Sequence, residues 1–432
     1  MDNTPSSKFA SLTRRDALKT VGAATAALAM PSLARAATSA GTIKVGFISP
    51  TTGPLALFGE TDSYTLDKMR ALFASGLDIG GKNYNIEIVA RDDQSDPNKA
   101  AQLAGDLILS EKVHLMIPAS TTDTINPVAD QCELNGVPCI SAGAPWQAVV
   151  MPRGGKDKPF DWTYHFFWGL EDALATYVGL WKSVETNKKV GMLFPRNADG
   201  ETWGNRDYGL PPAVEAAGFK TVIPSMFQPR TNDFSAQISE YKNAGCDIVG
   251  GISYPSDLKT FINQCSQQNY HPKVVTVAAA LLFPSGIEAM GKLGDGLSTE
   301  VWWTPAFPFK SSLTGENCRQ LADGWESVQK KQWTQPLGYS HALWEVAVDT
   351  LKRSANPLDR TAIRDALKAV NLNTMVGPIK FTGKPHPNIC KTPILGGQWV
   401  KGEKWPFDLK IVDNSVSKVV PTEGKLKLLT WS

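Results

Sequence analysis

A repeated alternation of short apolar runs with amphipathic segments constrains the fold of this chain more than any other feature. Between residues 97 and 109, for example, Ala100, Ala104 and Leu107 recur at helical spacing, and a strand-like run stands on either side. Parallel strands require long crossover connections, which helices of this length supply. The alternation therefore predicts an α/β fold in which helices cover parallel sheets on both faces.

The alternation occurs in two consecutive series of similar size. In the first, strands are expected at 43–48, 86–90, 114–117 and 138–141, and helices at 61–73, 97–109 and 126–134. In the second, strands are expected at 189–194, 219–223, 247–252 and 273–277, and helices at 170–184, 205–217, 233–243 and 255–268. The stretch 151–161 between them is rich in Gly, Pro and Lys, as a surface connection should be. Since 432 residues exceed one ordinary core, we predict two doubly wound parallel-sheet lobes.

The first 36 residues have the composition of an export signal. Arg14 and Arg15 precede an apolar run at 21–30, and a small-x-small ending closes at Ala36. The apolar run is too short to span a bilayer, so we expect cleavage after Ala36 and a mature protein in the periplasm. The paired arginines resemble a twin-arginine translocation (Tat) signal, with the general secretory route as the alternative. A disordered tail or a small helix is the other interpretation of this segment.

Charge and motif content argue against several classes of function. Residues 1–36 carry five of the 44 basic and two of the 42 acidic residues, so the rest of the chain is nearly neutral and nothing in it points to nucleic acid. The sequence has no nucleophile elbow, P-loop or zinc-protease motif, and its five histidines are scattered. The six cysteines suit an oxidising compartment, but no C-x-x-C occurs and any pairing is left open. We therefore expect a protein that is not an enzyme and needs no metal or cofactor.

Polar residues follow the predicted strands of the first series, where open α/β sheets bind ligands. Hydroxyl groups and the free N–H groups at a helix start attract an anionic oxygen such as a carboxylate. Plain N-capping by Ser120 or Thr121 is the alternative explanation of these residues. The candidate ligand-binding residues of this series are Phe58, Ser120, Thr121, Thr122, Gly143, Pro145 and Trp146.

Aromatic residues follow the strands of the second series. The chain contains 13 Trp, and aromatic faces give a cleft apolar contact area and stack on planar ligands or cations. Core packing is the alternative role for each of these side chains. The candidate ligand-binding residues here are Trp203, Tyr254 and Phe283, with Trp302 in a stretch expected near the hinge.

Several segments, in their order and spacing, resemble one known family. They are Gly53-Pro54 with Phe58-Gly59, Pro118 to Thr121, Gly136 to Ser141, Asp247 to Pro255 and Val376 to Phe381. From Ile43 to about Phe381, the chain is similar to the branched-chain amino acid/amide family of periplasmic binding proteins, which has the type I leucine-binding-protein fold. The resemblance implies two lobes joined by a multi-strand hinge. It assigns 42–160 and about 290–380 to the first lobe, with helices at 315–331, 339–354 and 358–369, and 161–289 and about 381–432 to the second.

The resemblance also implies roles for the candidate residues. Ser120 and Thr121, with the loop from Gly143 to Trp146, would hold the carboxylate of a ligand. Trp203 and Tyr254 of the second lobe would close over it.

One position departs from the family pattern. The glutamate that pairs with the ammonium group of an amino acid in the family has no counterpart at 279–283 here. An unpaired buried ammonium would be costly, so we expect an aromatic or apolar carboxylate, or an amide, rather than a leucine-like ligand. The alternative partners for an ammonium group are Asp123, Asp199 and Asp257.

These expectations describe the solute-binding subunit of an ABC importer, which traps a small molecule by hinge closure. Its partner would be the membrane permease of the transporter, and the subunit itself would be a monomer. A periplasmic sensor subunit is the alternative within the binding class. A secreted α/β enzyme that uses the same cleft is the alternative of another class.

Overall fold

The computed structural model describes Met1, residues 39–155 and residues 158–431 of the chain. The predicted export signal at 1–36 therefore lies, apart from Met1, outside the described residues. In the part that is described, none of the helices combines the length and the apolar character needed to cross a membrane.

The first lobe is built on a seven-stranded sheet with the order β14-β6-β5-β4-β1-β3-β2. All neighbouring strands in it are parallel except β2, which pairs antiparallel with β3 at one edge. The strands are β1 (Thr42–Ser49), β2 (Leu77–Ile79), β3 (Lys82–Asp92), β4 (Leu115–Pro118), β5 (Cys139–Ser141), β6 (Thr163–Phe166) and β14 (Ile389–Cys390).

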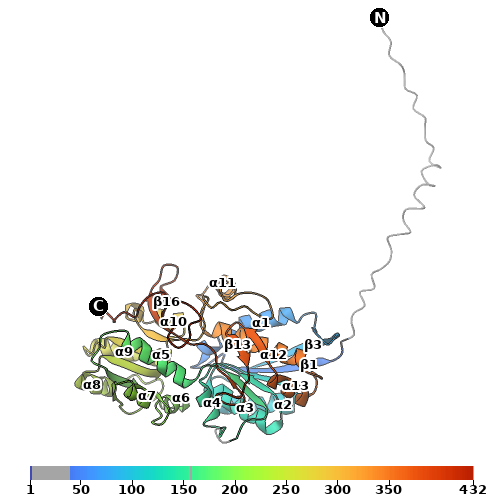
Figure 1. Ribbon diagram of the computed structural model, residues 1–432, viewed down its shortest axis with the longest axis horizontal. Coiled ribbons are helices and arrows are strands. Elements are labelled where there is room, and N and C mark those ends of the chain that lie inside the picture. Colours follow the sequence, from blue (N-terminus) through green and yellow to red (C-terminus); the bar gives the residue numbers. More distant parts are fainter. Residues whose placement is uncertain (2–38, 156–157, 432) are drawn as a thin grey trace, which may run out of the picture. The chain divides into compact units, whose positions relative to one another are not determined.

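Helices cover both faces of this sheet, as Figure 1 shows. Phe47 on β1 stacks on Trp344 of α12, with ring centroids 6.2 Å apart, whereas its neighbour Ile48 packs with Leu107 of α2 on the other face. Successive residues of a strand point to opposite faces, so one apolar strand supplies both cores. A two-stranded ribbon of β12 (Asn371–Thr374) and β13 (Gly377–Lys380) lies against α12. The helices of this lobe are α1 (Asp62–Leu72), α2 (Pro97–Leu109), α3 (Thr122–Asn135), α4 (Trp146–Val150), α11 (Cys318–Gln329), α12 (Pro336–Arg353) and α13 (Arg360–Lys368).

The second lobe is built on a seven-stranded sheet with the order β16-β15-β11-β10-β9-β7-β8. Its first five strands in sequence are parallel, and the last two are antiparallel to their neighbours. The strands are β7 (Lys189–Leu193), β8 (Lys220–Val222), β9 (Ile248–Ser253), β10 (Val274–Ala279), β11 (Ser298–Val301), β15 (Leu395–Lys401) and β16 (Phe407–Asp413).

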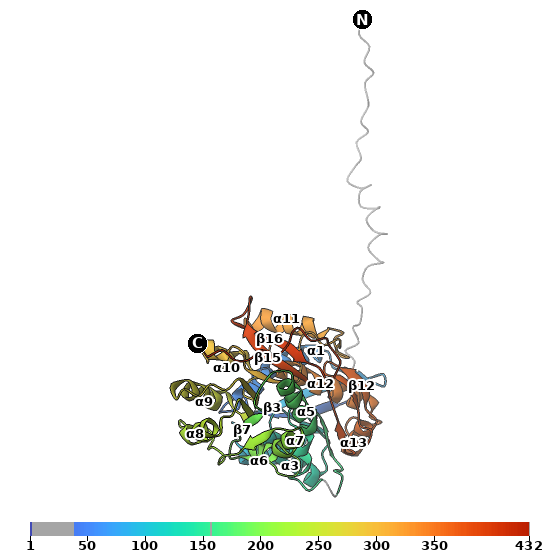
Figure 2. The same ribbon diagram turned by 60° about the vertical axis from the view of Figure 1, so that its left-hand side comes forward.

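Helices of the second lobe also pack on two faces of their sheet. Trp181 of α5 packs against Gly250, whereas Tyr241 of α8 packs against Gly191, which is level with Val249 in the sheet. In both views α8 lies beside α9 (Figures 1 and 2). The helices are α5 (Leu170–Lys182), α6 (Ala198–Trp203), α7 (Leu210–Ala216), α8 (Ser235–Ala244), α9 (Pro255–Gln267) and α10 (Pro284–Glu288).

The chain passes between the two sheets at three places. It leaves β6 through 167–169 to α5, returns after β11 through Trp302 towards α11, and leaves β14 through 391–394 to β15. The prediction of two doubly wound α/β lobes is confirmed, and the connection between them has the several strands that the resemblance implied.

Strand membership differs from the expected lobe boundaries at three places. β6 begins at Thr163 yet belongs to the first sheet, because Ile140 and Ser141 of β5 pair with it in parallel. β11 lies after residue 290 yet belongs to the second sheet, where it pairs with β10 and β15. β14 lies after residue 381 yet belongs to the first sheet, where it pairs with β6. None of these short strands has the long apolar run that marks a central strand in the sequence.

The predicted helix at 205–217 is wrong in its first half. The helix there, α7, begins at Leu210, and Pro211 occupies its first turn. Proline has no backbone N–H to donate and clashes with the preceding turn, so it is tolerated at a helix start and not in the interior. A separate short helix, α6, precedes it and ends at Trp203.

A substitution at Gly251 should destabilise the second lobe. Its φ is +145°, and a Cβ atom there would lie 2.1 Å from the backbone oxygen of Leu193 on the neighbouring strand. We expect Gly251→Ala to lower the free energy of unfolding by about 2 kcal/mol or more, measured by urea denaturation.

Gly105→Ala is the matched control. Gly105 lies inside α2, and no atom stands within 4 Å of the place that an alanine methyl group would occupy, so alanine should raise stability there by about 0.5–1 kcal/mol. Equal effects of the two substitutions would contradict the close approach of β7 and β9.

Candidate ligand-binding site

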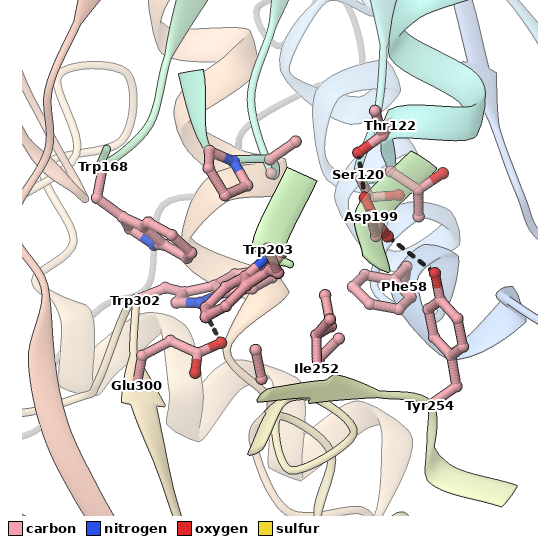
Figure 3. A pocket seen from close by; sticks show the side chains of 16 residues that line it. Phe58, Ser120, Thr122, Trp168, Asp199, Trp203, Ile252, Tyr254, Glu300 and Trp302 are labelled. Carbon is pink, nitrogen blue, oxygen red and sulfur yellow. Dashed lines mark hydrogen bonds between the residues drawn. The ribbon is translucent and has the colours of Figure 1, made fainter. Parts of the chain in front are cut away.

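A cavity of about 40 Å³ lies where the carboxyl ends of strands from both lobes meet. The first lobe contributes the segments that follow β1, β4 and β5, and the second lobe contributes those at the ends of β7, β9, β10 and β11 (Figure 3). Trp168 and Trp302 line it from two of the three crossings. The cavity is lined by Phe58, Ser120, Thr121, Thr122, Gly143, Ala144, Pro145, Trp168, Asp199, Trp203, Ile252, Tyr254, Ala278, Ala279, Glu300 and Trp302.

Most of the residues predicted from the sequence meet at this cavity. Strand ends of a parallel sheet lie at one edge, which is why residues far apart in the chain converge. Those that line it are Phe58, Ser120, Thr121, Thr122, Gly143, Pro145, Trp203, Tyr254 and Trp302.

Trp146 and Phe283 do not line the cavity. Trp146 begins α4, and its Nε1 donates to Glu171 at 3.4 Å, outside the cavity. Phe283 is fully buried and packs edge-on against Phe58, with ring centroids 4.9 Å apart. Position after a strand end predicts that a residue is near the site, but it does not predict the direction of the side chain.

Ser120 has the geometry of a ligand-contacting residue. Its φ is +80°, which is strained for a non-glycine residue, and its buried Oγ has no hydrogen-bond partner in the described chain. Gly143 lets the loop after β5 approach Ser120 closely, since a Cβ atom at position 143 would lie 2.9 Å from the Ser120 Cα. Thr121, in contrast, caps α3 by accepting from the Thr124 N–H at 3.4 Å. Capping therefore accounts for Thr121 and leaves Ser120 unexplained by the local fold.

Asp199 connects the two lobes at one end of the cavity. Thr122 of the first lobe donates to it at 2.7 Å, and Tyr254 of the second lobe donates to it at 2.8 Å. Asn197, which caps α6, donates in turn to the Tyr254 hydroxyl at 2.7 Å. Burial raises the pKa of Asp199, and the two hydroxyl donors partly offset this rise. The sequence marked Asp199 as an alternative partner for an ammonium group, and its hydrogen bond to Thr122 was not foreseen.

Glu300 and three tryptophans form the other end (Figure 3). Tyr177 donates to Glu300 at 2.6 Å, and the Trp302 Nε1 donates to it at 3.2 Å. Burial raises the pKa of Glu300. Trp168 packs against Trp302 with centroids 6.0 Å apart, and its Nε1 has no partner among the described residues.

Sequence reasoning missed Glu300 and Trp168 for identifiable reasons. Glu300 lies in Ser298–Val301, a strand with too few apolar residues to be recognised. Trp168 follows β6, which was not predicted as a strand either. Aromatic residues directly after 163–166 were the one available signal.

Metal-binding geometry is absent from the part of the chain that the structure covers: its His, Cys, Asp and Glu side chains form no group that could hold an ion. The six cysteines are free and buried.

A further buried carboxylate, Asp62, supports the loop that carries Phe58. It accepts hydrogen bonds from Ser49 at the end of β1 and, at 2.8 Å, from Ser340 of α12. It thereby joins the loop after β1 to the long central helix. Burial raises the pKa of Asp62 to about 7.

Asp62→Asn should change how stability depends on pH. The pKa of Asp62 in the folded state, about 7, exceeds the ordinary value of 3.8. The protonated Asp62 therefore contributes its full stabilisation of the fold below pH 3.8, and this contribution is lost as the pH rises to about 7. Asparagine does not ionise, so between about pH 5 and pH 8 the free energy of unfolding of the variant should fall by about 3 kcal/mol less than that of the wild type. Urea denaturation at both pH values measures this, with the exposed Asp67→Asn as control. Parallel pH profiles of Asp62→Asn and wild type would contradict it.

Comparison with known proteins agrees with the fold. The model of the family described as "Periplasmic binding protein" matches residues 42–403. The Leu/Ile/Val-binding protein homolog 7 of Brucella abortus is 24% identical over 392 residues, which cover 86% of this chain and 92% of the relative.

Two solved structures share the fold. The leucine-binding protein LivK of Thermotoga maritima has a TM-score of 0.69 at 18% identity, covering 86% of this chain and 99% of LivK. A solute-binding protein of an ABC transporter from R. palustris, in complex with benzoate, has a TM-score of 0.68 at 19% identity, covering 89% and 99%. The family and these relatives are described as binding proteins, which confirms the prediction that the chain is not an enzyme. With one family model spanning both lobes and the cavity between them, this chain belongs to the periplasmic binding protein family.

Proposed function

We propose that this protein is the extracytoplasmic solute-binding subunit of an ABC importer and that it captures a small molecule between its lobes by hinge closure. The observation that carries the proposal is the Thr122–Asp199 hydrogen bond of 2.7 Å, which joins the two lobes beside the cavity. Side chains on separate lobes can reach this distance only when the lobes are closed. The closed form would shield the ligand from water and present both lobe faces to the permease.

The crossings supply a suitable hinge. Phe167 on the first crossing packs against Trp302 on the second at 4.8 Å and against Tyr339 of α12 at 4.9 Å. These rings hold the crossings together next to the cavity, so the lobes would rotate about this cluster. Hinges of this kind need a few residues at element ends to change their backbone angles.

Ser120 is the proposed first contact of the ligand. All the ligand classes expected from the sequence, which are a small carboxylate, an amide and an amino acid, carry an oxygen that can accept its hydroxyl proton. The ligands named for two similar structures, benzoate for the R. palustris protein and isoleucine for LivJ of Streptococcus pneumoniae, also carry such an oxygen.

The remaining parts of the proposal come from the sequence. The signal at 1–36 would direct the chain to the periplasm by the twin-arginine route. There it would act as a monomer, with the permease of the transporter as its partner.

Ligand capture can be tested by a thermal-shift screen against amino acids, aromatic acids, aliphatic acids and amides. A compound that binds only the folded protein raises its melting temperature. The compound with the largest shift should also reduce the radius of gyration in small-angle X-ray scattering, and cells that lack the protein should lose its uptake. Binding without any loss of uptake would contradict the importer role and favour a sensor.

Ser120→Ala should weaken binding of that compound about tenfold or more, because one hydrogen bond in a buried site is lost. Ser253→Ala is the matched control: its Oγ is also buried without a partner in the described structure, but Ser253 does not line the cavity. Calorimetric titration measures both. Equal affinities of Ser120→Ala and wild type would place the ligand elsewhere.

A further inference from the structure

The lining of the cavity contains carboxyl groups but no basic side chain that could serve as their counter-ion. Its acidic residues are Asp199 and Glu300, and no Lys, Arg or His is among the described residues that line it. Neither carboxylate takes part in any of the ion pairs within the described ranges. A buried charge is normally paired, because its removal from water is costly.

All the hydrogen-bond partners of Asp199 are neutral. They are the hydroxyl groups of Thr122 and Tyr254, which donate at 2.7 and 2.8 Å. Asp123 lies close enough to add a second negative charge, and burial together with Asp199 raises the pKa of Asp123 to about 6. The positive end of α3, which could have received an anionic ligand, is therefore already next to carboxylates of the protein itself.

Glu300 is likewise held by neutral donors. Tyr177 and Thr299 donate to one oxygen at 2.6 and 3.1 Å, and Trp302 donates to the other at 3.2 Å. Glu300 lies at the same end of the cavity as Trp168 and Trp302 (Figure 3). A group that lies there meets a carboxylate and the faces or edges of aromatic rings at the same time.

These surroundings oppose an anion and attract a cation. Like charges at contact distance repel far more strongly inside a protein than in water, so a ligand carboxylate beside Asp199 or Glu300 would be strongly disfavoured. The faces of tryptophan rings attract ammonium-type groups, and the attraction is strongest where both are removed from water.

We infer that the ligand is a small organic cation. Its protonated amine lies at the Glu300 end of the cavity, and an uncharged group such as an amide places an oxygen at the Ser120 end. The inference rests on the proposed function, since it names the class of ligand that the same cavity captures. It narrows the expected classes by excluding free carboxylic acids and by ranking zwitterionic amino acids below cationic amides.

A set of four compounds on one carbon skeleton tests the charge directly. For leucine, these are leucinamide, leucine, 4-methylpentanoate and 4-methylpentanamide, which combine the presence or absence of the ammonium group with an amide or a carboxylate. The same four forms of alanine and phenylalanine cover smaller and larger ligands. We expect the amino amide of the best skeleton to bind tightest in calorimetric titration, about tenfold or more ahead of the amino acid, and the acid without ammonium not to bind.

Substitution of the carboxylates provides the second arm. Glu300→Gln should weaken the amino amide at least tenfold and leave the neutral amide unchanged, and Asp199→Asn should act in the same direction if Glu300→Gln does not fold. Glu345→Gln is the matched control, because Glu345 is also a buried carboxylate, held by the Met375 N–H at 2.9 Å, but does not line the cavity. Glu345→Gln should leave the affinity for the amino amide unchanged.

The outcomes separate this inference from the proposed function. Tight binding of a carboxylate without ammonium, or unchanged affinity of Glu300→Gln for the amino amide, overturns the cationic ligand and leaves solute capture intact. A neutral amide that binds as well as the amino amide shows that the acids act as protonated donors and also overturns it. If none of the twelve compounds raises the melting temperature or closes the lobes, both the cationic ligand and capture in this cavity are contradicted.

Discussion

Three passages of the chain between the lobes determine where the cavity between them lies. Parallel strands present their carboxyl ends at one edge of each sheet, and the crossings after β6 and β11 bring these two edges together. Trp168 and Trp302 lie on these same two crossings and form part of the cavity wall. The connections between the lobes and the cavity therefore share residues, so a motion of one lobe relative to the other would change the cavity directly.

Backbone strain occurs at this edge in both lobes. Ser120 of the first lobe and Ala279 of the second both have positive φ values, +80° and +63°, and both line the cavity. Such conformations cost about 1 to 3 kcal/mol each in non-glycine residues. The fold accepts this cost where strand ends of the two lobes meet, and a bound ligand that satisfies the Ser120 hydroxyl would offset part of it.

The sequence predicted the sheets better than it predicted individual contacts. Long apolar runs such as β1 and helices with a clear apolar stripe such as α2 were placed correctly, because their burial depends on spacing alone. Short strands such as β6 were missed, since their burial arises from pairing with β5 and leaves no pattern in sequence. The candidate site followed the same rule: Ser120 and Tyr254 were found from strand ends, whereas Glu300 is placed by contacts with Tyr177 and Trp302 that depend on the assembled lobe.

The order of the strands has a consequence for how the protein can be made. β14, at residues 389–390, forms the edge of the first sheet, and β15 and β16, at residues 395–413, form the edge of the second. Both sheets are thus finished by the same short stretch, residues 389–413. During synthesis, neither lobe has its full set of strands until this stretch has left the ribosome, and the two lobes acquire their final edges together.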